Sequence, residues 1–198
     1  MSIILGLDVS TSCTGICVLN SSTVLDDVGS HILHLNRIEF NGCKTLWDKA
    51  DRVHQYLSSE PVVLYHIDRI VIEEPLMGFR TGMSSAQTIT QLMKFNGICS
   101  FIARNIFRVE PEYIGSAHAR KLCGVKLQRT ALGGPQKEQV FSHMLEHDLK
   151  HVIWPLKKSG KVIDGSRDMC DAYVIARAAM INGVIIPQKK TKTKKVAQ

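Results

Sequence analysis

The chain has 198 residues, of which 44% are hydrophobic, enough for a globular core and too many for general disorder. Its apolar runs are far too short to span a bilayer, and the N-terminus lacks the charged region and cleavage site of a signal peptide. The six cysteines include no Cys-x-x-Cys pair and form no disulfide framework. We therefore expect a soluble intracellular protein with no membrane partner.

The net charge of +7 favours a polyanionic partner, nucleic acid first. Part of this excess lies in the lysine-rich end, Lys189 to Lys195. We expect residues 1–187 to form one domain and residues 188–198 to form a flexible basic tail.

The first forty residues predict an antiparallel meander of three strands. An apolar run from Ile3 ends on Asp8, small polar residues follow, and a second apolar run extends from Gly15 to Leu19. The segment from His31 to Phe40 alternates apolar and polar residues, as a strand with one buried face does.

Helices and two further strands are expected after the meander. Helical spacing is found from Lys44 to Leu57, and a β-rich run from Ile67 to Ile72 ends in Glu73-Glu74. The remaining predicted elements are a loop from Leu76 to Ser84, a long helix from Ser84 or Ser85 to about Ile106, a strand from Val109 to Ile114, and helices over Ser116–Leu122, Gln136 to about Lys150, and Ser166 or Asp168 to Gly183. This order predicts an α/β fold, a five-stranded mixed sheet with helices on both faces.

Carboxylates occur at three separated places: Asp8 ends the first strand, Glu73 ends the fourth, and Asp168 and Asp171 share one face of the last helix. Each has a simpler explanation, since Asp8 could cap a turn and Asp168 could favour a helix N-terminus. Together they would repel one another, and hard divalent cations relieve such repulsion. Two such ions can activate water and stabilise the leaving oxygen of a phosphodiester.

Three motifs in this order resemble the RuvC Holliday-junction resolvases of the ribonuclease H-like superfamily. They are Gly6-Leu7-Asp8-Val9-Ser10 with Thr14-Gly15, Val71-Ile72-Glu73-Glu74, and Asp168-Met169-Cys170-Asp171-Ala172. The resemblance implies a ribonuclease H-like fold and a homodimer that nicks two strands of like polarity across a four-way DNA junction. It also implies two Mg²⁺ or Mn²⁺ ions held by Asp8, Glu73, Asp168 and Asp171, and hydrolysis that leaves a 3′-hydroxyl and a 5′-phosphate.

The same resemblance suggests residues that meet DNA. Lys121 and Lys137 stand where the family carries basic residues near the scissile phosphate. Leu76 stands where members commonly carry an aromatic wedge, so Phe79 and Arg80 are the candidates for base stacking and phosphate binding. Met77 and Arg120 complete the predicted DNA-binding set. The compartment expected for such a protein is the cytoplasm or nucleoid, with organelle and viral settings open.

Two other functions remain open from the sequence. The segment from Asp8 to Gly15 also resembles the phosphate loop of the sugar kinase, actin and Hsp70 group, although no second such loop is found and a kinase would not explain the Asp-x-x-Asp helix. A DNA-binding module without catalysis is the other alternative. His143, His147 and His151 recur every four residues, which predicts one polar helix face and less readily a zinc site.

Overall fold

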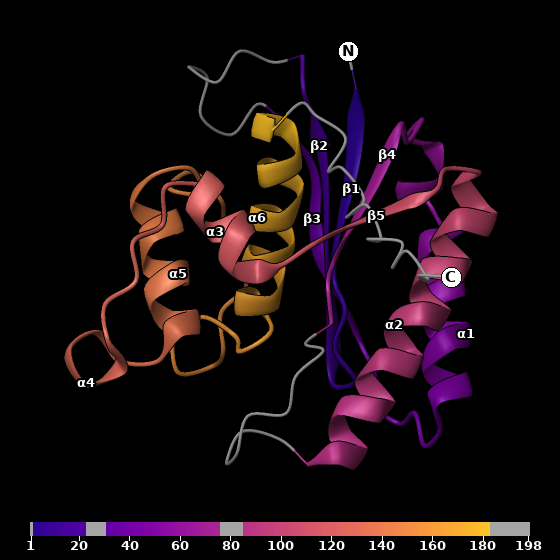
Figure 1. The fold of residues 1–198 in the computed structure, drawn as a ribbon, viewed down its shortest axis with the longest axis horizontal. Coiled ribbons are helices and arrows are strands. Elements are labelled where there is room, and N and C mark those ends of the chain that lie inside the picture. The colour runs from indigo at the N-terminus through magenta and orange to yellow at the C-terminus, as the bar shows by residue number, and fades with distance from the viewer. Residues whose placement is uncertain (1, 23–30, 76–84, 183–198) are drawn as a thin grey trace, which may run out of the picture.

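The computed structural model describes residues 2–22, 31–75 and 85–182. Five strands form one mixed sheet in the order β3-β2-β1-β4-β5, with β1 at its centre (Figure 1). The strands are β1 (Ile3–Asp8), β2 (Cys13–Asn20), β3 (Ile32–Glu39), β4 (Arg69–Glu73) and β5 (Pro111–Ile114). The pairs β1–β2 and β2–β3 are antiparallel, whereas β1–β4 and β4–β5 are parallel. The predicted meander and mixed sheet are therefore confirmed.

Helices cover both faces of this sheet (Figure 1). On one face lie α1 (Leu46–Leu57) and α2 (Ala86–Phe107); on the other lie α3 (Ser116–Leu122), α5 (Gln136–Glu146) and α6 (Ser166–Asn182). Side chains cap the first two helices: Thr45 forms a capping box with Asp48, and Ser85 accepts a hydrogen bond from the Thr88 amide. None of the helices in the described ranges is both long and apolar enough to cross a bilayer.

The structure corrects the predicted end of one helix. The helix expected to reach Lys150 ends at Glu146, because His147 takes a non-helical conformation and the chain turns. His151 therefore lies outside the helix, and the predicted three-histidine face is wrong. Two short elements were not predicted, the 3₁₀ helix Val62–Leu64 and α4 (Thr130–Gly133). Each is a single turn, too short to show a hydrophobic period.

The alternation of side chains along the central strands separates two cores. Leu5 and Leu7 of β1 pack with Ile70 and Ile72 of β4 under α1 and α2. Ile4 of the same strand lies instead in the core under α3, α5 and α6. Residues of β1 with even numbers therefore face α6, and Asp8 is one of them.

Two glycines let α6 lie unusually close to the sheet. A Cβ at Gly6 would lie 2.6 Å from the carbonyl oxygen of Ala172 and 2.7 Å from the Cβ of Ala176. A Cβ at Gly15 would collide with the main chain of Asp168. Only glycine permits this approach of helix backbone to strand backbone. The distance of α6 from the β1–β2 hairpin is therefore set by residues without side chains.

Replacing Gly15 by alanine should destabilise the fold, since the new methyl group meets main-chain atoms that cannot rotate away. We expect the free energy of unfolding to fall by about 1–3 kcal/mol or more, as for overpacked cores. The matched control is Gly115→Ala before α3, where φ is −70° and an added Cβ has only a Glu74 carboxylate oxygen within 4 Å, at 3.9 Å; stability there should change by less than about 1 kcal/mol. Urea unfolding of both variants measures the difference, and equal stability would contradict the packing argument.

Candidate active site

Asp8 and Glu73 lie at the ends of neighbouring parallel strands. Gly6 pairs with Val71 and Leu7 with Ile72, so the last residues of β1 and β4 stand level. Glu73 lies two residues beyond Val71, which belongs to the core under α6, so both acids point to that side. Glu74 is exposed, as strand alternation predicts. The two side chains are close enough for a hydrogen bond between their carboxyl groups.

The first turns of α6 bring two more carboxylates to the same place. Asp168 lies where the helix backbone meets Gly15, the residue that pairs with Asp8 across the hairpin. Asp171 follows one turn later and is only 6% exposed. The negative charge of Asp171 raises the pKa of Asp8. The charges of Glu73 and Asp168 in turn raise the pKa of Asp171. The structure therefore gathers all four acids expected from the sequence.

Burial makes this cluster electrostatically unfavourable when every member is ionised. Burial raises the pKa of Asp8 well above its usual value, and the charges of Asp171 and Glu73 raise it further. Burial likewise raises the pKa of Asp171, although Lys137 and Arg120 oppose that rise. One oxygen of Asp8, Oδ2, is buried without a hydrogen-bond partner in the described residues. A positive charge placed beside Asp8 would therefore stabilise the ionised form of the cluster.

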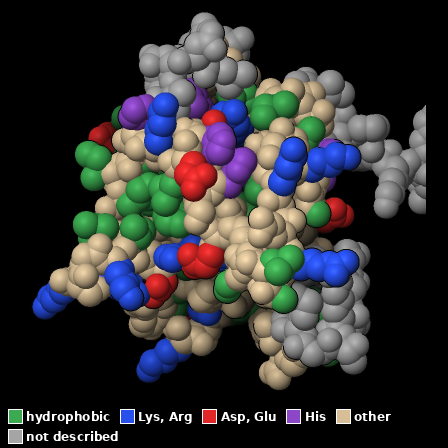
Figure 2. Space-filling model, turned by 90° about the vertical axis from the view of Figure 1, so that its left-hand side faces the viewer, with side chains coloured by type: hydrophobic (Ala, Val, Ile, Leu, Met, Phe, Trp, Pro, Cys, Tyr) green, Lys and Arg blue, Asp and Glu red, His purple; other side chains and the backbone are tan. Residues whose placement is uncertain are grey.

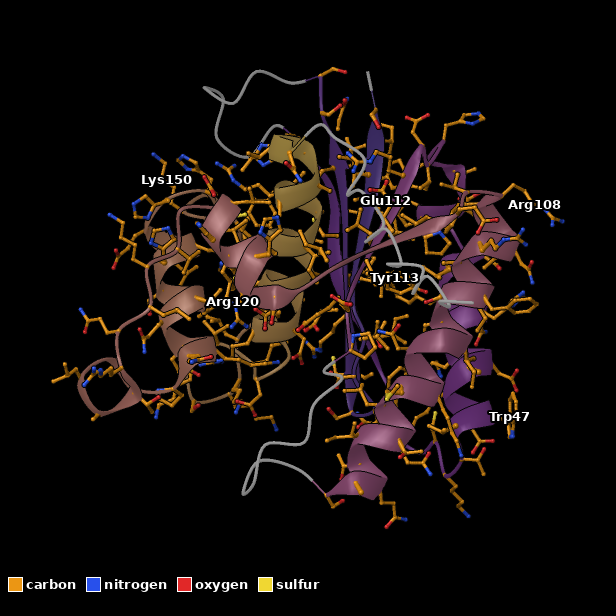
Figure 3. The ribbon with its side chains drawn as sticks, viewed as in Figure 1. Trp47, Arg108, Glu112, Tyr113, Arg120 and Lys150 are labelled. Atoms are coloured by element: carbon orange, nitrogen blue, oxygen red, sulfur yellow. The ribbon has the colours of Figure 1, made fainter. Side chains whose placement is uncertain are left out.

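Lys137 and Arg120 supply part of that charge. Lys137 Nζ lies 2.7 Å from Asp168 Oδ1 and 3.5 Å from Asp171 Oδ2. Burial alone would lower the pKa of Lys137, but the carboxylates of Asp8, Asp171 and Asp168 outweigh it and raise the pKa. Arg120 points from α3 toward α6 (Figure 3), with Nη2 3.7 Å from Asp171 Oδ1. Its buried Nε has no hydrogen-bond partner in the described residues, so this guanidinium keeps one N–H without an acceptor.

Other predicted residues lie apart from this cluster or outside the described ranges. Lys121 is exposed on α3 and has no ion pair within the described part of the chain. Phe79, Arg80 and Met77 fall in residues 76–84, outside the described residues. His143 and His147 stack with ring centroids 4.3 Å apart, and no group of three or more metal-binding side chains is found around them in the described ranges.

One neighbour of the site was missed from the sequence. The Cys13 thiol lies beside Asp168 and within hydrogen-bonding reach of it, and burial followed by that carboxylate raises the pKa of Cys13 to about 12. Cys13 stands two residues before Gly15, so strand alternation places both on the α6 face. A thiol that keeps its proton at neutral pH can donate to Asp168, which fixes the orientation of that carboxylate.

The four carboxylates suit a hard divalent cation, because their oxygens are the ligands that Mg²⁺ and Mn²⁺ prefer. The unpartnered Asp8 Oδ2 and the raised pKa values of Asp8 and Asp171 agree with such a ligand set. The described residues contain no group of three or more His, Cys, Asp or Glu already arranged to hold a metal. Lys137 lies against Asp168 and Asp171 in this arrangement.

Comparison with known proteins identifies the fold. No family model and no curated protein sequence matches the chain. Among solved structures, T. thermophilus RuvC in complex with a Holliday junction substrate is 13% identical, with a TM-score of 0.57 over 92% of this chain and 95% of that one. A second structure of Thermus thermophilus RuvC is 16% identical, with a TM-score of 0.55 over 91% and 95%. A fowlpox virus resolvase bound to Holliday junction DNA matches with a TM-score of 0.47 and 11% identity, over 92% of this chain and 99% of that one.

The fold is thus of the ribonuclease H-like class, a five-stranded mixed sheet flanked by helices. Within that class it is the fold of the RuvC-type Holliday junction resolvases. The resemblance seen in the three sequence motifs is confirmed at this level.

The raised pKa of Asp8 predicts a stability that depends on pH. The folded chain holds this proton more tightly than the unfolded chain, so the stabilising contribution is full below the ordinary Asp pKa. It is lost as the pH rises through the raised value. Without divalent metal, Asp8→Asn should therefore be more stable than the parent at pH 7, and the gain should shrink toward pH 4.

Urea unfolding at several pH values in a chelator tests this expectation. Asp51→Asn, at an exposed position of α1, is the matched control for the change of charge and should show no comparable gain. An Asp8→Asn variant less stable than the parent at pH 7 would contradict the electrostatic account.

Proposed function

We propose that the chain is a metal-dependent, structure-selective DNA endonuclease that resolves four-way junctions by paired nicks. The observation that carries the proposal is the convergence of four carboxylates from three separate segments at the end of β1. The RuvC fold supports it, since one protein of that fold was solved with a Holliday junction substrate. The net charge of +7 fits a nucleic-acid partner.

In this proposal Asp8, Glu73, Asp168 and Asp171 would hold two Mg²⁺ or Mn²⁺ ions. When bound, such ions supply Lewis-acid activation of a phosphodiester and an activated water. Asp8 and Glu73 are held at the ends of strands, and Asp171 is buried, so the ligand oxygens lose little freedom on binding. The Cys13 thiol orients Asp168.

Lys137 and Arg120 are placed to act on the phosphate. Both cations already face the carboxylates, at 2.7 Å from Asp168 for Lys137 and 3.7 Å from Asp171 for Arg120. Once the charge of those acids is balanced by bound cations, the ammonium of Lys137 would be free to stabilise charge that develops on the phosphoryl oxygens. Lys121, exposed one position along α3, would bind the DNA backbone away from the reacting bond.

The alternatives account for less of the site. A phosphate loop of the kinase type would use the turn after Asp8 but would leave Asp168 and Asp171 without a role. A binding module without catalysis would not need a buried, mutually repelling set of acids. Such a set would lower the stability of the fold without contributing to its function. Assays for ATP hydrolysis and for junction cleavage, run on the same purified protein, separate the three functions.

Asp8→Asn should abolish cleavage of a four-way junction while binding of that junction survives. Loss of this carboxylate would remove several kcal/mol of charge stabilisation, which corresponds to a rate at least about 10³-fold lower. A gel assay of labelled junction in Mg²⁺ measures nicking, and a gel shift in chelator measures binding. Nicking by Asp8→Asn at the parental rate would refute the assignment, and junction binding without any nicking by the parent would favour the inactive module.

A homodimer would place two such sites on one junction, and α2 offers a face for it. Met93 and Phe101 are 40% and 62% exposed, and Gly97 between them has open space where a Cβ would be. Residues four apart on a helix lie on one side. This stripe lets a second α2 approach closely, so we assign it to the dimer contact.

Phe101→Asp should dissociate the dimer, because a buried carboxylate without a partner is unfavourable at an apolar contact. Sedimentation velocity of the parent and variant measures the change, with Leu132→Asp as control at another exposed apolar residue, which is 81% exposed on α4. A parent that is monomeric at micromolar concentration, or a Phe101→Asp variant that remains dimeric, would contradict this assignment.

A further inference from the structure

A groove lies between the N-terminal halves of α1 and α2, on the sheet face opposite α6. Its volume is about 1070 Å³, and Thr11, in the turn that follows Asp8, is among the residues that line it. The carboxylate site lies on the other side of that turn. The two sites are thus separated by the sheet and joined through residues 9–12.

The charged side chains that line this groove are all basic, and no carboxylate is among them. Lys44, Lys49 and Lys94 line it, with no Asp or Glu among the lining residues. Neither Lys44 nor Lys94 has an ion pair within the described residues. Gln87 and Gln91 stand beside Lys94 at helical spacing along α2 and add amide donors.

Lys49 links the groove to the turn. Its Nζ donates a hydrogen bond of 2.6 Å to the Thr11 carbonyl oxygen, and it lies 5.9 Å from the centre of the Phe40 ring. Trp47, at the start of α1, is 70% exposed and is among the residues that line the groove. An exposed indole beside lysines provides a flat apolar surface against which a sugar–phosphate backbone can pack.

We propose that this groove binds the phosphodiester backbone of a DNA arm, away from the strand that is cut. The inference rests on the proposed function and names where the rest of the substrate is held. Lysine, glutamine and threonine supply the polar lining of this groove, and Leu46, Trp47 and Ile98 supply the apolar part. Lysines act as point charges that suit phosphates without sequence preference.

The salt dependence of junction binding tests the proposal. We compare the parent with the double variant Lys44→Gln/Lys94→Gln, in chelator so that the DNA stays intact. Loss of two phosphate contacts in each groove should lower the slope of log Kd against log salt by about 2 for every groove that holds an arm, and weaken binding at least about 10-fold near 0.1 M salt. The matched control is Lys150→Gln/Lys158→Gln, with the same change of charge at exposed lysines near the α5 face.

That control tests whether the loss of any two exposed lysines weakens junction binding to the same extent. Figure 2 shows the α5 side of the molecule, where Lys and Arg side chains are interspersed with acidic and hydrophobic ones instead of lining one groove. The control should keep the parental slope. An equal loss of junction affinity in both double variants, or no loss of affinity in Lys44→Gln/Lys94→Gln, would overturn the proposal. A parent that binds no junction at low salt would overturn the proposed function as well.

Two further measurements locate the DNA. With a junction whose arms are shortened to the few base pairs beside the branch, the parent and Lys44→Gln/Lys94→Gln should bind alike. Acrylamide quenching reports on Trp47, because the other tryptophan, Trp154, has its indole nitrogen buried and packs on Phe141. Junction DNA with full arms should protect the quenchable signal that Trp47→Phe removes. Quenching that is unchanged by DNA would overturn the placement of an arm in this groove.

Discussion

The contact between α6 and the β1–β2 hairpin is the constraint on which the site depends. Gly6 and Gly15 allow the helix backbone to rest on the strand backbone, so the first turns of α6 reach the end of β1. Any side chain at Gly15 would displace the main chain at Asp168 and move Asp168 and Asp171 away from Asp8. The chemistry at one end of the sheet thus depends on two residues that take no part in it.

The same closeness makes the site a source of instability. Four acids meet where Asp8 and Asp171 are each only 6% exposed, and the pKa values of both rise for that reason. Lys137 relieves part of the repulsion through its contacts with Asp168 and Asp171, but it leaves Asp8 Oδ2 without a partner. A chain selected only for stability would replace Asp8 with a neutral residue, so its presence agrees with the cation that the proposed function requires.

Local pattern was sufficient to predict the sheet and the residues at its ends. Apolar runs that end in Asp8 and Glu73 are readable because strand edges are marked by a change from apolar to polar residues. The early end of α5 at Glu146 was not readable, since His147 and the residues after it keep an apolar spacing that the turn overrides. The partners of Asp168 were also hidden: Cys13 and Gly15 lie more than 150 residues away, and only the folded contact shows what the thiol and the missing side chain do.

A site of four carboxylates repels the polyanion that it is proposed to cut, which separates affinity from chemistry. Lys137 and Arg120 form ion pairs with Asp168 and Asp171, so in the absence of bound cations they attract a phosphate only weakly. Affinity has then to come from cations that face no acid, and Lys44 and Lys94 in the α1–α2 groove meet that condition among the described residues. Because Thr11 belongs both to the groove and to the turn after Asp8, a backbone held there would lead toward the carboxylates. Binding on one face of the sheet would in this way position the strand that is cleaved on the other.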